Sequence, residues 1–122
     1  MTEDISGPSM RRDKARARLV QQVVAYAFDV PLEEMAAPTR RAANIAFARQ
    51  VAMYLAHVAF ELSLSRVGLI FGRDRTTAAY ACHRVEDARD EAALDAKLDA
   101  LEAFLRHAPD LEPARAFNGA RA

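Results

Sequence analysis

Apolar residues recur along this chain with the spacing of α-helices. Leu19, Val23 and Ala27 form one stripe, which predicts a helix over about residues 14–28. A longer stripe predicts a second helix over about residues 40–60, and its members are Ile45, Ala48, Ala52, Leu55 and Ala59. No stretch alternates apolar and polar residues as a half-buried strand would. The pattern therefore favours an all-α protein.

Turn and capping residues divide the rest of the chain. The segment Asp29-Val30-Pro31 separates the first two helices, and residues 32–35 are predicted to add one helical turn. Ser63 is a suitable N-cap for a short helix over residues 64–71, which Gly72 ends as a C-terminal glycine does.

Two more helices follow the glycine. Asp74 can cap a helix that continues to about Arg89, with Ala78, Cys82 and Val85 on its core face. The last helix is marked by Leu94, Leu98, Leu101 and Leu105. The sequence thus predicts a compact all-α bundle of five to six helices.

The length of 122 residues is that of one domain. Residues 1–13 lack periodicity, so we expect a mobile N-terminal arm, a folded domain over residues 14–108 and a mobile tail over residues 109–122. No apolar run approaches the ~18 residues that a membrane span needs. The first basic residues precede no apolar segment of a signal peptide. We therefore expect a cytoplasmic protein with no membrane contact.

Composition limits the chemistry that this chain can perform. One cysteine, Cys82, cannot form an internal disulfide, suits a reducing cytoplasm and is expected in the core. His57, His83 and His107 lie far apart, so no metal or other cofactor is expected. No carboxylate pair lies in a cleft-like pattern and no nucleophile lies beside a histidine at a recognised catalytic spacing, so we expect no enzymatic activity. The phosphate loop of ATPases is also absent, and no nucleotide is expected.

The net charge is zero, but the charges are unevenly distributed. Residues 40–89 carry eight arginines against four acidic residues, whereas residues 90–122 carry four basic and seven acidic residues. Arginine suits bidentate contacts with phosphate and guanine. A solvated mosaic of surface charges remains an alternative interpretation of this asymmetry.

The two short helices over residues 64–71 and 75–89, with a glycine-containing turn between them, are typical of a helix-turn-helix. In that motif the start of the second helix enters the major groove of DNA. Residues 73–77, Arg-Asp-Arg-Thr-Thr, are more polar than a single cap requires. They predict a DNA-reading tip.

These residues also resemble a known family, the C-terminal DNA-binding domain of the bacterial replication initiator DnaA, which has a Trp-repressor-like helix-turn-helix. Its GGRDHTTV-type signature is similar to Gly-Arg-Asp-Arg-Thr-Thr-Ala at residues 72–78, followed by Tyr-Ala-Cys-His-Arg-Val-Glu at residues 80–86. Its arginine-glutamine helix is similar to residues 48–56, and the start of its motif to residues 63–71. The resemblance covers about residues 18–105.

The resemblance implies two sets of DNA contacts. It implies base contacts from Arg41 in the minor groove and from Asp74, Arg75 and Thr76 in the major groove. It implies phosphate contacts from Arg40, Arg49, Gln50, Ser65, Arg73 and Thr77. Two milder alternatives remain, in which Asp74 is only a cap and Arg41 is only a solvated residue.

Four positions depart from the family pattern. Arg75 stands in place of a histidine, and a guanidinium there suits guanine O6 and N7. Phe71 stands in place of the first glycine of a pair, His57 in place of a basic residue, and Ser65 in place of a proline. DNA binding follows from the resemblance, but recognition of the family's usual box does not.

The sequence therefore predicts a small cytoplasmic, nucleoid-associated regulator that binds specific double-stranded DNA and acts in transcription or chromosome replication. A helical protein-interaction adaptor without DNA affinity is the main alternative, and a small enzyme is a second one. The oligomeric state stays open, a monomer included.

Overall fold

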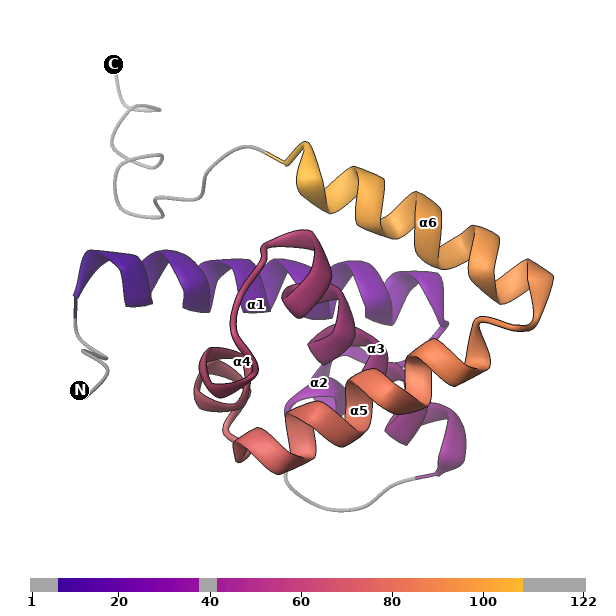
Figure 1. The fold of residues 1–122 in the computed structure, drawn as a ribbon, viewed down its shortest axis with the longest axis horizontal. Helices are drawn as coiled ribbons and strands as arrows, with labels where there is room; N and C mark the ends of the chain where they lie inside the picture. Colours follow the sequence, from indigo (N-terminus) through magenta and orange to yellow (C-terminus); the bar gives the residue numbers. More distant parts are fainter. Residues whose placement is uncertain (1–6, 38–41, 109–122) are drawn as a thin grey trace.

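The computed structural model describes residues 7–37 and 42–108, and its regular structure there is entirely helical (Figure 1). The six helices of these residues are α1 (Pro8–Ala27), α2 (Leu32–Met35), α3 (Ala43–Ala59), α4 (Leu64–Phe71), α5 (Arg75–Ala88) and α6 (Ala92–Arg106). The predicted all-α fold with a helix-turn-helix is confirmed. None of these helices combines the length and the apolarity needed to cross a bilayer.

The first helix is longer than the apolar pattern predicts. α1 begins at Pro8 and not at Lys14, because proline suits the first helical turn and Gly7 supplies the extended backbone before it. Met10 is fully buried in these additional turns. Charged residues follow Met10 directly and interrupt the apolar periodicity, which is why the pattern misses it. Residues 8–13, expected in an arm, therefore form part of the helix.

Three segments lie outside the described residues, namely 1–6, 38–41 and 109–122. Arg40 and Arg41, two predicted DNA contacts, belong to the second of them. The first six residues of the predicted arm and the whole of the predicted tail lie in the other two, and the mobility of these residues stays a prediction.

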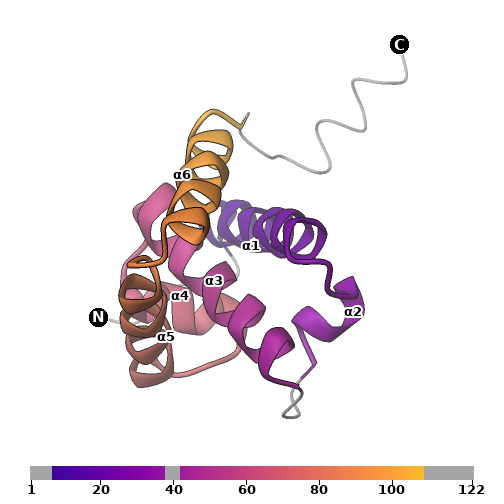
Figure 2. The same ribbon diagram turned by 90° about the vertical axis from the view of Figure 1, so that its right-hand side faces the viewer.

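α3 is the central helix, and it packs against each of the others (Figure 2). Its residues 51–56, Val-Ala-Met-Tyr-Leu-Ala, are all buried. Six consecutive buried residues cover every side of a helix, so this part of α3 is surrounded by protein. The small side chains of Ala48, Ala52 and Ala56 allow the neighbouring helices to approach its axis closely.

The helix-turn-helix has a smaller core of its own. Val67 of α4 and Ala78 and Ala81 of α5 pack on Met53 and Ala56 of α3. α4 and α5 are thus held on the central helix and not only on each other. This attachment fixes the position of the predicted recognition helix.

The predicted core face of α5 is confirmed, because Ala78, Cys82 and Val85 are all buried. Burial, and then the charge of nearby Glu86, raise the pKa of the Cys82 thiol to about 11. The thiol is therefore protonated and unreactive near neutral pH.

Arg89 joins three helices at the end of α5. Its guanidinium donates to the Tyr54 hydroxyl of α3 (2.9 Å) and to the carboxylates of Asp95 (2.5 Å) and Asp99 of α6. Burial disfavours the charge on Arg89, but these hydrogen bonds outweigh it and raise the pKa of the guanidinium. Arg89 is therefore the partner of two acidic residues of α6, Asp95 and Asp99.

A second ion pair joins α1 to the first helix of the motif. Asp13 of α1 is 5% exposed, and its Oδ2 lies 3.0 Å from Nε of Arg66 in α4. Arg66 also donates to the Ser9 hydroxyl (3.1 Å), and Asp13 accepts from Arg16 as well (3.3 Å). The early turns of α1 thus hold α4 in place.

Replacing Asp13 by alanine should lower the free energy of unfolding by about 3 kcal/mol, because it leaves the Arg66 charge in a largely buried site without its carboxylate. Urea denaturation followed by circular dichroism measures this loss. Asp87→Ala removes an exposed acid of α5 and should change stability by less than about 0.5 kcal/mol. Equal effects of the two substitutions would contradict a structural role for the Asp13–Arg66 pair.

Candidate nucleic-acid interface

The turn between α4 and α5 is a Schellman motif. Gly72 has a left-handed backbone (φ 69°), its amide donates to the Leu69 carbonyl (3.3 Å), and the Arg73 amide donates to the Gly68 carbonyl (2.7 Å). Phe71 remains helical, so the turn needs only one left-handed glycine. The absence of the family's other glycine therefore does not disrupt the turn.

Gly68 permits the chain to cross closely over α4. A Cβ atom on Gly68 would lie 2.7 Å from the Arg73 carbonyl oxygen and 3.0 Å from the carbonyl of Asp74. Backbone atoms cannot move aside as a flexible side chain can. The glycine thus brings the start of α5 against α4 and determines the direction in which the tip projects.

Asp74 is the N-cap of α5, as predicted. Its Oδ1 accepts a hydrogen bond from the Thr77 amide (2.8 Å), and this bond lowers the pKa of the Asp74 carboxyl. The side chain is therefore an anion throughout the neutral range. Its negative charge also interacts favourably with the free amide groups at the start of α5.

The polar tip is exposed where the sequence predicts it. Arg75, Thr76 and Thr77 form the first turn of α5 and are all exposed, whereas Ala78 beneath them is fully buried. No described residue makes a hydrogen bond or ion pair with the Arg75 side chain. The first turn of α5 thus offers three polar side chains to solvent.

Arg73 lies lower on the tip and is half-buried. Its guanidinium donates to the carbonyls of Gly72 (3.3 Å) and Ala37 (3.5 Å). Ala37, the last described residue before segment 38–41, therefore lies beside the turn between α4 and α5.

The predicted phosphate contacts on α3 are less exposed than the tip. Arg49 has a side chain that is 12% exposed, and its Nε donates to the Glu34 carbonyl of α2 (2.8 Å). Gln50 is half-buried. His57, in place of the family's basic residue, contacts the Leu62 carbonyl through Nδ1 (2.6 Å). Arg49, one of the predicted phosphate contacts, therefore also contributes to the fold by joining α3 to α2.

Ser65 is exposed in the first turn of α4, beside the cap that Ser63 makes with the Arg66 amide (3.1 Å). The structure thus brings together residues 73–77 at one tip and places Ser65 at the other end of α4.

Sequence reasoning overlooked Tyr80, which is 59% exposed on α5. It lies one helical turn after Thr76, so the i, i+4 spacing places both on one face. His83 and Arg84 are also exposed on α5. The helical spacing of these three residues from residues 73–77 is the signal that would have pointed to them as exposed neighbours of the tip.

Comparison with known proteins assigns the chain to a family. The family described as "Bacterial dnaA protein helix-turn-helix" matches residues 17–85. The chain belongs to this family. The match includes the whole of α4, the turn and most of α5.

Curated DnaA-family relatives agree with this assignment. The chain is 42% identical over 89 residues to the chromosomal replication initiator protein DnaA of Bordetella pertussis, covering 71% of this chain and 19% of that protein. It is 37% identical over 79 residues to the protein of the same name from Tropheryma whipplei, covering 65% of this chain and 16% of that protein. The chain thus spans less than a fifth of the length of these relatives.

One solved structure has the same fold. It is entitled "Crystal structure of DNA replication initiation factor" and superimposes with a TM-score of 0.70 at 24% sequence identity. The match covers 80% of this chain and 30% of that one. The chain therefore shares its fold with part of this structure.

The two glycines of the turn should respond differently to alanine. Gly68→Ala must displace backbone atoms and should cost about 2 kcal/mol of stability. Gly72→Ala meets no atom within 4 Å and should cost only about 1 kcal/mol through its left-handed backbone. Urea denaturation of both variants compares these costs, and a smaller loss for Gly68→Ala would contradict the close crossing.

Proposed function

We propose that this chain binds double-stranded DNA at specific sequences through the turn before α5 and the first turn of that helix. The observation that carries the proposal is the exposure of Arg75, Thr76 and Thr77 at a helix start fixed by Asp74. The first residues of the second helix of such a motif meet base edges in the major groove. The amides at the same helix start attract phosphate.

The base-reading roles follow from the chemistry of the tip. Oδ1 of Asp74 accepts from the Thr77 amide, and a carboxylate can accept several hydrogen bonds, so the same group can also accept from a cytosine amino group. Thr76 can contact either a base edge or a thymine methyl group. Arg75 can donate two hydrogen bonds to guanine. Arg41 is proposed to enter the adjacent minor groove, where narrow A·T-rich steps attract arginine.

The phosphate-binding roles are assigned to the polar groups around the tip. Arg73 and Thr77 would hold the phosphates beside the recognition helix, and Ser65 a phosphate at the start of α4. Arg40, Arg49 and Gln50 would contact the backbone next to the minor groove. Arg49 combines this role with its hydrogen bond to Glu34.

In the cell we propose a small, nucleoid-associated cytoplasmic regulator. Its relatives are named chromosomal replication initiator proteins, and its sites would resemble those of the DnaA family. It would regulate transcription, or replication through sites that overlap those of the initiator. Selection of bound duplexes from a random DNA pool tests this proposal, since enrichment of no sequence would overturn it.

A protein-interaction adaptor is the second candidate, favoured by an exposed apolar groove between α1 and α6. Binding to DNA and binding to a protein use different surfaces, so the two roles are compatible. The adaptor becomes the sole function if the chain has no affinity for duplex DNA at low salt.

Duplex affinity should depend strongly on salt. On the order of four to six phosphate contacts give a slope of log K against log[salt] of roughly −3.5 to −5.5. Arg73→Gln should weaken binding to all sequences alike and flatten the slope by about 1. Fluorescence anisotropy over a salt series measures both values. Arg106→Gln removes a charge on α6 and serves as the matched control, and a salt-independent affinity would exclude the predicted contacts.

Arg75 should determine one base pair of the target. A bidentate contact with guanine discriminates by about 1–3 kcal/mol, and histidine cannot make it. Arg75→His should therefore relax or redirect the preference at that base pair, while non-specific affinity stays within about tenfold. Sequence logos selected with the two proteins provide the comparison.

The logos also separate a base contact from a phosphate contact. If Arg75 turns outward to a phosphate, Arg75→His lowers affinity for every sequence and leaves the logo unchanged. That outcome would contradict the base-reading role. A change confined to one base pair would support it.

A further inference from the structure

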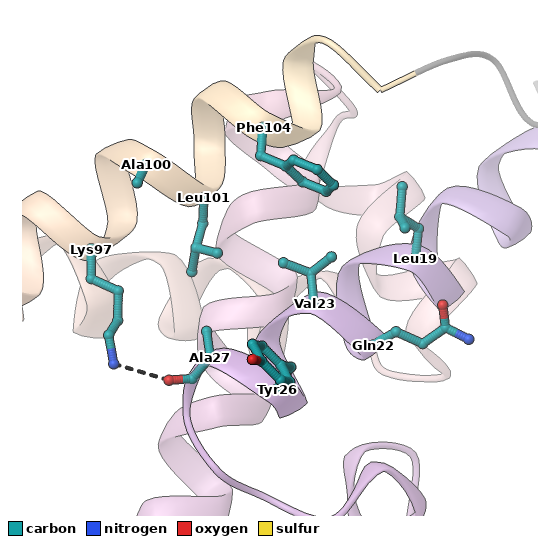
Figure 3. A pocket seen from close by; sticks show the side chains of 9 residues that line it. All are labelled: Leu19, Gln22, Val23, Tyr26, Ala27, Lys97, Ala100, Leu101 and Phe104. Atoms are coloured by element: carbon teal, nitrogen blue, oxygen red, sulfur yellow. Dashed lines mark hydrogen bonds between the residues drawn. The ribbon is translucent and has the colours of Figure 1, made fainter.

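α1 and α6 form an exposed apolar groove of about 600 Å³ (Figure 3). Leu19 and Val23 of α1 and Leu101 of α6 form its floor. Tyr26 and Phe104 stand at its rim and are 91% and 57% exposed. Two large aromatic side chains beside one apolar groove mark an interaction surface.

The groove lies away from the DNA-reading tip. α6 and α1 run along one side of the molecule, whereas the start of α5 projects from another side (Figure 1, Figure 2). Because the groove and the tip lie on different sides, an occupant of the groove can bind together with DNA.

Lys97 closes one end of the groove. Its ammonium group donates to the Ala27 carbonyl (3.0 Å) and lies 4.6 Å from the centre of the Phe28 ring.

One exposed ridge of α1 borders the groove and indicates what covers it. Lys14, Arg18, Gln22 and Tyr26 follow at intervals of four residues and are all exposed. Asp29, also exposed, comes just after the helix. The ridge is thus positive at its first half, neutral at its centre, and aromatic and then negative at its end.

This order of side chains is complementary to itself. A two-fold axis at Gln22 places Arg18 of one chain opposite Tyr26 of the second copy, which allows a cation–π contact. The same axis brings Lys14, about 12 Å from the centre, close to Asp29 of the second copy. Residue i then meets residue j and j meets i, as in a closed two-fold interface.

We propose that the groove is the interface of a homodimer in which two α1 ridges pack antiparallel. The aromatic rims of Tyr26 and Phe104 would cover the apolar floors of both copies. A uniformly acidic partner helix would fit Lys14 and Arg18 but would be repelled by Asp29. A second copy satisfies both ends of the ridge.

Oligomeric state measured without DNA tests this proposal, so the result does not depend on the proposed DNA binding. In sedimentation equilibrium the mass should rise with concentration from 13.5 kDa toward twice that value. We expect a weak dimer with a dissociation constant on the order of 100 µM, as for a small interface. A chain that stays monomeric at about 1 mM would overturn the proposal and leave the groove to another protein.

Charge reversal identifies the interface. Lys14→Glu alone and Asp29→Lys alone should each weaken the dimer by about tenfold. In either variant, residues 14 and 29 of the two copies carry like charges, and the two-fold axis repeats this repulsion at both ends of the interface. The variant carrying both changes should dimerise as the unmodified chain does. Lys14 and Ala27, the last residue of α1, lie about 20 Å apart along the helix axis, and Asp29 follows that far end, so the rescue cannot come from a pair within one chain.

One control and two further test variants accompany the charge reversals. Asp87→Lys makes the same charge change on α5 and should leave the dimer intact. Asp29→Asn suits the left-handed backbone at this position (φ 55°) and tests the loss of charge if Asp29→Lys does not fold. Tyr26→Ala should weaken the dimer through loss of the rim. A dimer that is unaffected by Lys14→Glu and by Tyr26→Ala would refute this interface.

Discussion

The burial of α3 on every side is the constraint on which the other helices depend. α3 contacts the five other helices, and alanines at several positions along it, among them Ala48, Ala52 and Ala56, allow them to approach closely. The surrounding helices are then tied to one another by charged contacts at the edge of the core. Asp13 and Arg66 join α1 to α4, and Arg89 joins α5 to α6. The apolar centre supplies most of the stability, and these pairs fix the arrangement around it.

Asp74 shows how one side chain can serve both the fold and specificity. Its pKa is lowered by the Thr77 amide, so the tip carries a permanent negative charge between two arginines. A carboxylate that approaches DNA is repelled by phosphate unless a base donates a hydrogen bond to it. In the proposed function, the arginines attract any duplex, whereas Asp74 penalises those without a donor at the matching base. Discrimination would then come partly from a repulsive group that the helix needs as its cap.

Features that depend on local sequence could be predicted, and features that depend on distant contacts could not. The bounds of α4 and the cap of α5 followed from Ser63, Gly72 and Asp74, because caps act within one helical turn. The need for Gly68 was missed, since it arises only when the backbone after the turn crosses α4. The sequence also could not show that Arg49 donates to a carbonyl of α2. The exposure of residues 74–77 was predicted, whereas Arg73 is half-buried and donates to the Ala37 carbonyl, a contact that became visible only in three dimensions.

The arginine-rich middle of the chain is less available to DNA than its composition indicates. Of the eight arginines between residues 40 and 89, four make hydrogen bonds or ion pairs within the fold, namely Arg49, Arg66, Arg73 and Arg89. Arg75 and Arg84 are the exposed ones among those described, and Arg84 lies 6.0 Å from the Phe47 ring. A regional charge count therefore overestimates the non-specific attraction. With fewer arginines to hold any duplex, the proposed affinity must depend more on the few groups proposed to read bases, and Arg75 is the exposed cation at the described start of α5.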